Sequence, residues 1–311
     1  MYRFHVALAD LVAPVSGEHG ELPRLPLLEQ MLARADVQTA SASWRGWALQ
    51  RMGSRLGGRE PALARLLVDR YLPSAEARHW FVLTPLHLVA GLSTVHHHVG
   101  GPVRLGAAAA RSIAEALAAE FGDADARFDC LDGEILMGLS GALDVATTDP
   151  AQLAGRDLAD GVATGPDARR LARLCGEFEL WLHGRGVLGS DGRRVHALHP
   201  WGQGGSPVGS CPVPLRILCD DPFLRAASCV PAGSLGPDAP ALCVWSVADL
   251  LATGVNFEEA DRLWAASLLA RLREGEVAAA EVYAGGRAYE VSATQRWRVW
   301  RKARPWWEVV G

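Results

Sequence analysis

The sequence predicts an α/β protein in which helices flank a mixed β-sheet. Stretches with helical periodicity alternate along the chain with short apolar stretches of strand character, and two pairs of these strands read as hairpins. The 311 residues are 49% hydrophobic and 21% charged, which is typical of a globular protein with a substantial core. We expect a single α/β domain over residues 1–311, with any subdomain boundary near 200–214, where Gly, Ser and Pro gather.

Helix signals are apolar residues at a spacing of three to four, bounded by capping residues or glycines. Ser43 is the expected N-cap of one helix, which should bury Trp44 and Trp47 and stop at Gly57. Asn256 should cap the last of the long helices. Six helices are expected, over 25–35, 41–57, 61–72, 106–122, 167–186 and 256–275.

Strand signals begin with residues 2–8 and recur at 80–92, where we expect a break at Pro85, and at 214–222. Two further segments, FDCLDGEILMGLSG and EVYAGGRAYEVS, have the pattern of a β-hairpin. Their turns are expected at Asp132-Gly133 and Gly285-Gly286, because these residue pairs accept the positive φ angles of a two-residue turn.

The net charge of −4 argues against a general nucleic-acid-binding protein, which normally carries a basic surplus. No stretch approaches the length of an uncharged membrane span, and the N-terminus lacks the pattern of a signal peptide, so a cytoplasmic location is expected. The six cysteines lack the spacing of a zinc ribbon, and we interpret them as small buried side chains.

Three segments in this order carry a resemblance to a known family: WFVLTPLHLVAGLSTV, DARRLARLCGEFELWLHGRGVLGSDGRRVHALHPWGQGG and YEVSATQRWRVWRKARPW. They resemble bacterial RpfE-type regulatory proteins, also described as cofactor-independent phosphoglycerate mutase-like proteins, along residues 80–304. The resemblance implies an α/β fold similar to that of alkaline phosphatase.

The central segment departs from the mutase pattern at its polar positions. Arg185-Gly186-Val187-Leu188 stands where the mutases have His-Pro-Val-Asn, and His196 stands where they have an asparagine, whereas the turn at Gly202–Gly204 is kept. We therefore expect a catalytically reduced member of this class, acting in ligand binding or regulation.

The resemblance also implies what an active mutase would need. These enzymes hold two divalent metals, manganese or zinc, on Asp and His side chains beside a serine nucleophile. Asp10 could be the first ligand and Ser41 or Ser43 the nucleophile, but no histidine follows His199, and only the Asp220-Asp221 pair offers carboxylates late in the chain. Mutase activity is not expected.

A second hypothesis is a metal-dependent phosphoryl-transfer enzyme, of phosphatase or mutase type, with ligands at other positions. Glu179 and His183 lie four residues apart on one helix face, where they could bind manganese or zinc together with His87, or act as an acid/base pair. The alternative is an ordinary ion pair on the helix surface.

An anion site is the third candidate. Arg185, Arg193 and Arg194, with the backbone amides of Gly202–Gly204, could hold a phosphorylated small molecule or another anion. The alternative is a tight turn with Trp201 packed inward and the arginines in solvent.

The C-terminal segment RWRVWRKARPWW interleaves basic and aromatic side chains. It could make the chain an interaction protein that binds a protein partner through this tail. Alternatively, Trp297 and Trp300 pack one helical face onto the core while the arginines stay in water.

Overall fold

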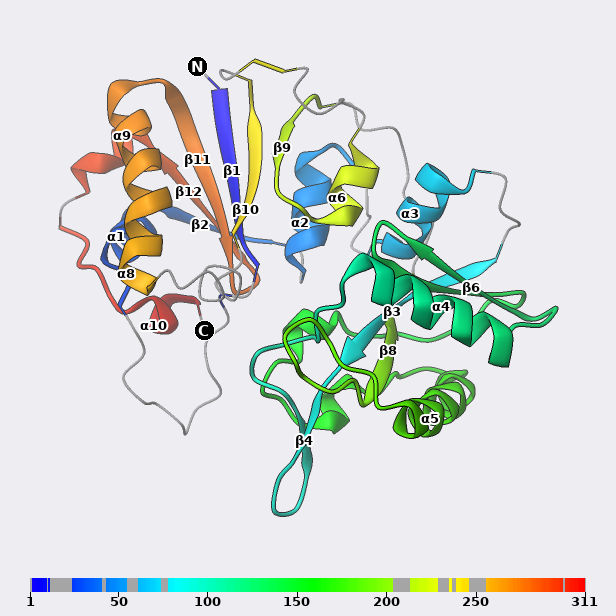
Figure 1. Cartoon of the computed structure of the whole chain (residues 1–311). Helices are drawn as coiled ribbons and strands as arrows, with labels where there is room; N and C mark the ends of the chain where they lie inside the picture. The colour runs from blue at the N-terminus through cyan, green and yellow to red at the C-terminus, as the bar shows by residue number, and fades with distance from the viewer. Residues whose placement is uncertain are drawn as a thin grey trace. The chain divides into compact units, whose positions relative to one another are not determined.

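The computed structural model describes residues 2–9, 11, 24–40, 43–54, 61–73, 78–203, 213–228, 235–236, 239–245, 256–298 and 300–310. The chain divides into two compact units (Figure 1). Unit 1 comprises Met1–Gly58 and Val208–Gly311, and unit 2 comprises Arg59–Pro207. One of the two passages between the units thus falls at 207/208, inside the segment 200–214. That the chain forms a single domain remains a prediction.

In the described part of unit 1, six strands form one mixed sheet. β1 (Tyr2–Leu8) lies parallel between β11 (Val277–Ala284) and β10 (Ala241–Trp245), and β10 pairs in parallel with β9 (Arg216–Leu218). β12 (Arg287–Ser292) pairs antiparallel with β11 and with β2 (Asp36–Thr39). The strand order is β2-β12-β11-β1-β10-β9. The expected α/β class with a mixed sheet and helices is confirmed.

Helices pack on both faces of this sheet because the side chains of each strand alternate between the faces. Val6 of β1 and Val282 of β11 belong to a core with residues of α1 (Pro26–Arg34), α9 (Ser267–Glu274) and α10 (Trp306–Val310). His5 of β1 and Tyr283 of β11 contact Trp47 of α2 (Trp44–Arg51) instead. Short α6 (Pro222–Ala227) lies beside α2 in Figure 1.

The expected helix over 256–275 is confirmed in an interrupted form. Asn256 caps α8 (Phe257–Asp261) by accepting a hydrogen bond from the backbone N–H of Glu259, and Gly275 ends α9 with a φ of 77°. Between α8 and α9, one π-helical turn spans Arg262–Ala266. The helix is therefore continuous in direction but locally widened.

In the described part of unit 2, β6 (Ala126–Leu131), β7 (Glu134–Leu139), β3 (His79–Leu86) and β8 (Ala197–Trp201) form an antiparallel sheet in that order. β4 (Leu88–Ala90) and β5 (Val95–His97) form a separate two-stranded sheet. The described helices of this unit are α3 (Leu63–Tyr71), α4 (Ala107–Phe121) and α5 (Ala168–Arg185), with 3₁₀ turns at Pro150–Gln152 and Leu158–Gly161.

The core of unit 2 lies between its sheet and the helices α4 and α5. Leu117 of α4 and Phe178 of α5 are fully buried against Phe81 and Met137 of the central strands. Both helices end at the glycines where the sequence predicts an end. Gly122 follows α4, and Gly186 follows α5 with a φ of 61°.

Both predicted hairpins are confirmed. β6 and β7 are joined by Asp132 and Gly133, with φ angles of 51° and 84°. β11 and β12 are joined by Gly285 and Gly286, with φ angles of 53° and 77°. Two consecutive positive φ angles match the right-handed twist of the flanking strands, which is why these residue pairs mark the turns.

The expected strand break at Pro85 is wrong, because β3 runs through it to Leu86. The pairing of β7 with β3 stops at Leu83, and the carbonyl of Pro85 accepts a hydrogen bond from the N–H of Val103 (2.8 Å). A residue's N–H and C=O leave a strand on the same side, so the missing N–H of Pro85 faces away from β8. The interruption comes at His87.

The helix expected over 41–57 is shorter, spanning Trp44–Arg51. Gly53 follows it with a φ of 94°, and the expected stop at Gly57 lies outside the described residues. Within the described residues, no helix is both long and apolar enough to cross a membrane.

Candidate functional site

Ser43 and Asp221 lie at the edge of the unit 1 sheet where its parallel strands end. In α/β sheets, ligands bind at the carboxyl ends of the strands, where the following helices begin. Ser43 precedes α2, and Asp221 follows β9 and precedes α6. Asp10, which follows β1 in the sequence, lies outside the described residues.

Ser43 is a helix cap. Its hydroxyl oxygen accepts a hydrogen bond from the backbone N–H of Gly46 (3.1 Å), and the side chain is buried. This is the capping role that its position before an apolar helix predicted. The hydroxyl oxygen is thus directed at the backbone of its own helix.

Asp221 has a largely buried carboxylate with three donors. Oδ1 accepts hydrogen bonds from the N–H groups of Phe223 (3.1 Å) and Leu224 (3.0 Å), which caps α6. Oδ2 accepts a hydrogen bond from Nε of Arg45 (2.9 Å), the second residue of α2. The neighbouring Asp220 is fully exposed, and its Oδ1 lies 3.9 Å from Nη1 of Arg225.

Arg45 is held in place by aromatic rings as well as by Asp221. Its guanidinium carbon lies 4.4 Å from the ring centroid of Trp44 and 5.3 Å from that of Phe223. A guanidinium over aromatic faces and against a carboxylate is strongly localised. The negative charge of Asp221 is therefore matched by a fixed cation of the chain itself.

A buried ionic network lies in the middle of the same sheet. Glu281 of β11 is opposite His5 of β1, with 3.2 Å between Oε2 and the ring Nδ1. Arg51 of α2 donates two hydrogen bonds to the same carboxylate, one from Nε at 2.6 Å and one from Nη2. Burial alone would raise the pKa of Glu281, but the hydrogen bonds and charges of His5 and Arg51 lower it to about 2.

The sequence reasoning missed this network. Its signal was a polar, ionisable residue within each of two apolar strand segments, His5 in YRFHVAL and Glu281 in VAAAEVYA. A charged side chain at an inward position needs a partner.

The residues that the structure describes do not fit a two-metal site. Among them, no group of three or more His, Cys, Asp or Glu side chains could hold a metal ion. Asp221 already carries a guanidinium on one of its oxygens, and Ser43 caps its helix. A dication at this edge would compete with the positive charge of Arg45.

In unit 2, His87 does not join Glu179 and His183 in a metal-ligating group. The Nδ1 of His87 donates a hydrogen bond to the backbone carbonyl of Arg194 (2.8 Å). Glu179 and His183 are exposed on α5, and no hydrogen bond or ion pair joins them in the described part of the chain. Loss of hydration raises the pKa of Glu179. Their assignment as metal ligands remains a prediction.

His87 instead belongs to a cluster with two other histidines. Its ring centroid is 4.6 Å from that of His196 and 5.3 Å from that of His98. Burial lowers the pKa of both neighbours, aided by Arg193 beside His98 and by His87 beside His196. His98 and His196 are therefore harder to protonate than a solvent-exposed histidine. Sequence spacing did not reveal the cluster, because the three residues come from separate segments.

Among the described residues, the members of the predicted anion site do not come together. Arg193 and Arg194 precede β8 and Gly202 follows it, and five residues of strand span about 17 Å. Trp201 is buried and donates its indole N–H to Oγ1 of Thr84 (2.6 Å). Gly204 lies outside the described residues.

Each of the three arginines has a partner elsewhere. Arg193 binds the carboxylate of Asp191 and the carbonyls of Gly101 and Pro102, Arg194 donates to the carbonyl of His183 (2.9 Å), and Arg185 stacks on Trp181 at 4.4 Å. Anion binding by these residues remains a prediction.

The C-terminal tail packs onto unit 1 through a different tryptophan from those expected. Trp306 belongs to the core with α1 and is 5% exposed, whereas Trp300 is 71% exposed, so the expected packing of Trp300 is wrong. Arg298 pairs with Asp36, and Arg301 donates to the carbonyl of Ala35 (3.0 Å). The side chain of Trp297 is outside the described part.

In its described residues the chain is an α/β protein with a six-stranded mixed sheet, a four-stranded antiparallel sheet and a two-stranded antiparallel sheet. No protein-family model matches the sequence, and no curated protein matches it. Among solved structures, the chain is similar to a cofactor-independent phosphoglycerate mutase from Thermoplasma acidophilum DSM 1728. The TM-score is 0.37 and the sequence identity is 11%, over 94% of this chain and 90% of that chain.

Proposed function

We propose that this chain is a catalytically reduced phosphoglycerate mutase-like protein that acts in ligand binding or regulation, as its resemblance to RpfE-type proteins implies. The observation that carries the proposal is the ion pair between Arg45 and Asp221. A metal-dependent phosphoryl transfer needs carboxylates that are free to neutralise dications. The charge of Asp221 is already matched by a guanidinium that two aromatic rings hold in place.

Two further features support the same proposal. The hydroxyl of Ser43 accepts a hydrogen bond from its helix backbone, so its oxygen is engaged in a structural role. Gly186, within the segment that replaces the mutases' His-Pro-Val-Asn, has a left-handed conformation that ends α5. This segment thus serves the helix end.

The ligand we propose is a phosphorylated small molecule or another small anion, encountered in the cytoplasm. The net charge of −4 disfavours nucleic acid as the partner. Manganese or zinc belongs only to the alternative of an active phosphoryl-transfer enzyme.

The test is an assay of mutase and phosphatase turnover with added manganese or zinc, together with the metal content of the purified protein without a His tag. We expect no turnover above a metal-free control and substoichiometric metal. The Arg45→Ala variant, which frees Asp221, should remain inactive, because the described residues provide no group of further ligands around that carboxylate. Turnover well above the control in the wild type would overturn the proposal.

Stoichiometric metal that is lost when His87, Glu179 and His183 are replaced would instead support the metal-dependent alternative. No contact among the described residues favours that alternative at present.

One observation favours a second function, that of an interaction protein. Trp300 is 71% exposed and is followed by the exposed Arg301, Lys302 and Arg304. Exposed tryptophan with arginine is typical of the energetic centre of an interface. In cell extract, Trp300→Ala should shift the chain from a large complex to its monomer size, with unchanged unfolding. An unchanged elution profile would exclude Trp300 as a contact.

A further inference from the structure

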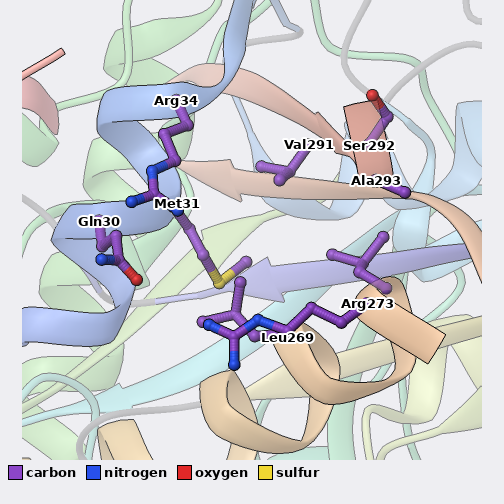
Figure 2. Close-up of a pocket in the computed structure, with 9 residues that line it drawn as sticks. Gln30, Met31, Arg34, Leu269, Arg273, Val291, Ser292 and Ala293 are labelled. Carbon is purple, nitrogen blue, oxygen red and sulfur yellow. The ribbon is translucent and has the colours of Figure 1, made fainter. Parts of the chain in front are cut away.

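Unit 1 contains a small, solvent-open pocket whose lining includes none of the candidate residues considered above (Figure 2). Its walls come from α1, from α9 and from the segment where β12 ends.

The floor of the pocket is apolar. Met31 of α1 and Leu272 of α9 are buried, Val291 of β12 is nearly so, and Leu269 is half-buried. These side chains belong to the core of unit 1 or pack against it, and are therefore fixed by their neighbours. They offer a preformed apolar surface to a ligand.

The rim of the pocket carries two arginines whose guanidinium groups have no hydrogen bond or ion pair to any described residue, Arg34 of α1 and Arg273 of α9. In Figure 2, both side chains and that of Gln30 extend toward the side chain of Met31. Three other arginines of unit 1 have carboxylate partners: Arg24 with Glu29, Arg271 with Glu276, and Arg298 with Asp36. Two positive charges at one pocket are therefore left unmatched.

We propose that this pocket binds a small amphipathic anion, with its head between Arg34 and Arg273 and its apolar body on Met31, Leu269 and Val291. The proposal names the ligand class for the ligand-binding function proposed above, on which it rests. Guanidinium groups suit the head because each can donate two parallel hydrogen bonds to carboxylate or phosphate oxygens. The apolar floor adds affinity in proportion to the area that it removes from water.

A structural explanation competes with this proposal. Arg34 and Arg273 stand in the last turns of α1 and α9, where the helix dipole stabilises a cation without any ligand. This explanation predicts no saturable binding, so the two can be separated by titration.

The experiment is calorimetric titration of the full chain with four probes: hexyl phosphate, hexanoate, hexanol and inorganic phosphate. We expect saturable binding of one or both amphipathic anions, and at least tenfold weaker binding of hexanol and of inorganic phosphate. The ratio of hexyl phosphate to hexanoate then distinguishes a phosphate head from a carboxylate head. Equal affinity for inorganic phosphate and hexyl phosphate would overturn the proposal, as would no saturable binding of either amphipathic anion.

Variants locate the site. Arg273→Ala and Arg34→Ala should each weaken binding of the preferred anion by about tenfold or more, as expected for loss of a charged hydrogen bond. Leu269→Asn should lower the affinity for the amphipathic anion and leave the affinity for inorganic phosphate unchanged. Arg271→Ala is the matched control, since it lies on the same helix, pairs with Glu276 and does not line the pocket.

Unchanged affinity in both Arg34→Ala and Arg273→Ala would overturn the proposal. Mutase turnover would refute the proposed function but would not change the affinities measured for the variants. A failure of the proposed function can therefore be told apart from a failure of the proposed pocket.

Discussion

Replacing Glu281 by glutamine tests the buried ionic network of unit 1. The carboxylate is almost fully buried and accepts hydrogen bonds from Arg51 and His5, which lower its pKa from 4.5 to about 2. One pKa unit corresponds to about 1.4 kcal/mol, so the charged form contributes about 3 kcal/mol to the free energy of unfolding at neutral pH.

The sign of the pH dependence follows from the direction of the shift. Because the pKa of the folded state is the lower one, the contribution is complete above about pH 5 and is lost as the pH falls toward 2. Glu281→Gln removes the titrating group. The variant should therefore be less stable than the wild type by about 3 kcal/mol at pH 7, and the two stabilities should converge as the pH approaches the folded-state pKa.

Urea unfolding followed by tryptophan fluorescence at several pH values between 7 and 3 measures this difference. Glu276→Gln is the control, because Glu276 pairs with Arg271 at the exposed surface, where an ion pair contributes at most about 1 kcal/mol. If the wild type and Glu281→Gln keep a constant difference over the whole pH range, the network does not stabilise the charged carboxylate as argued.

Three further predictions concern packing, backbone and thiol chemistry. Trp306→Ala should lower the free energy of unfolding by about 3 to 5 kcal/mol, because the ring is buried in the core; a loss below 1 kcal/mol in urea unfolding would contradict this. Gly285→Ala should destabilise more than Gly286→Ala, because both have positive φ but only the first would place a Cβ against Val310; equal urea midpoints would refute it. Burial raises the pKa of the Cys175 thiol to about 12, so it should resist alkylation at pH 8 until the chain unfolds, as mass spectrometry would reveal.

Local features of the fold could be predicted from the sequence, since they depend on a few adjacent residues. The turns at Asp132-Gly133 and Gly285-Gly286 require positive φ, which few other residue pairs accept. Ser43 and Asn256 cap their helices through their own side chains. These elements follow from local chemistry without knowledge of the tertiary fold.

The arrangement of these elements could not be predicted in the same way. Phe4 pairs with Ala241 on one side and with Ala280 on the other, and nothing in the local sequence selects these partners. The pairs Arg45–Asp221 and His5–Glu281 likewise join distant segments, as does the pocket between α1 and α9. Pro85 did not break the strand as predicted. A proline interrupts strand pairing only where its missing N–H faces a neighbouring strand, and the local sequence does not show which side that is.

Unit 1 is built from two segments of the chain, and all of unit 2 lies between them in the sequence. The order in which the ribosome makes these segments therefore matters for folding. β1 is central in its sheet, yet both of its partners, β10 and β11, come from the second segment of unit 1. At translation rates of about 5 to 20 residues per second, β1 waits on the order of tens of seconds for them, while all of unit 2 has already left the ribosome. During that interval β1 is an unpaired apolar strand, the kind of segment that chaperones bind. Slow translation should therefore affect unit 1 far more than unit 2.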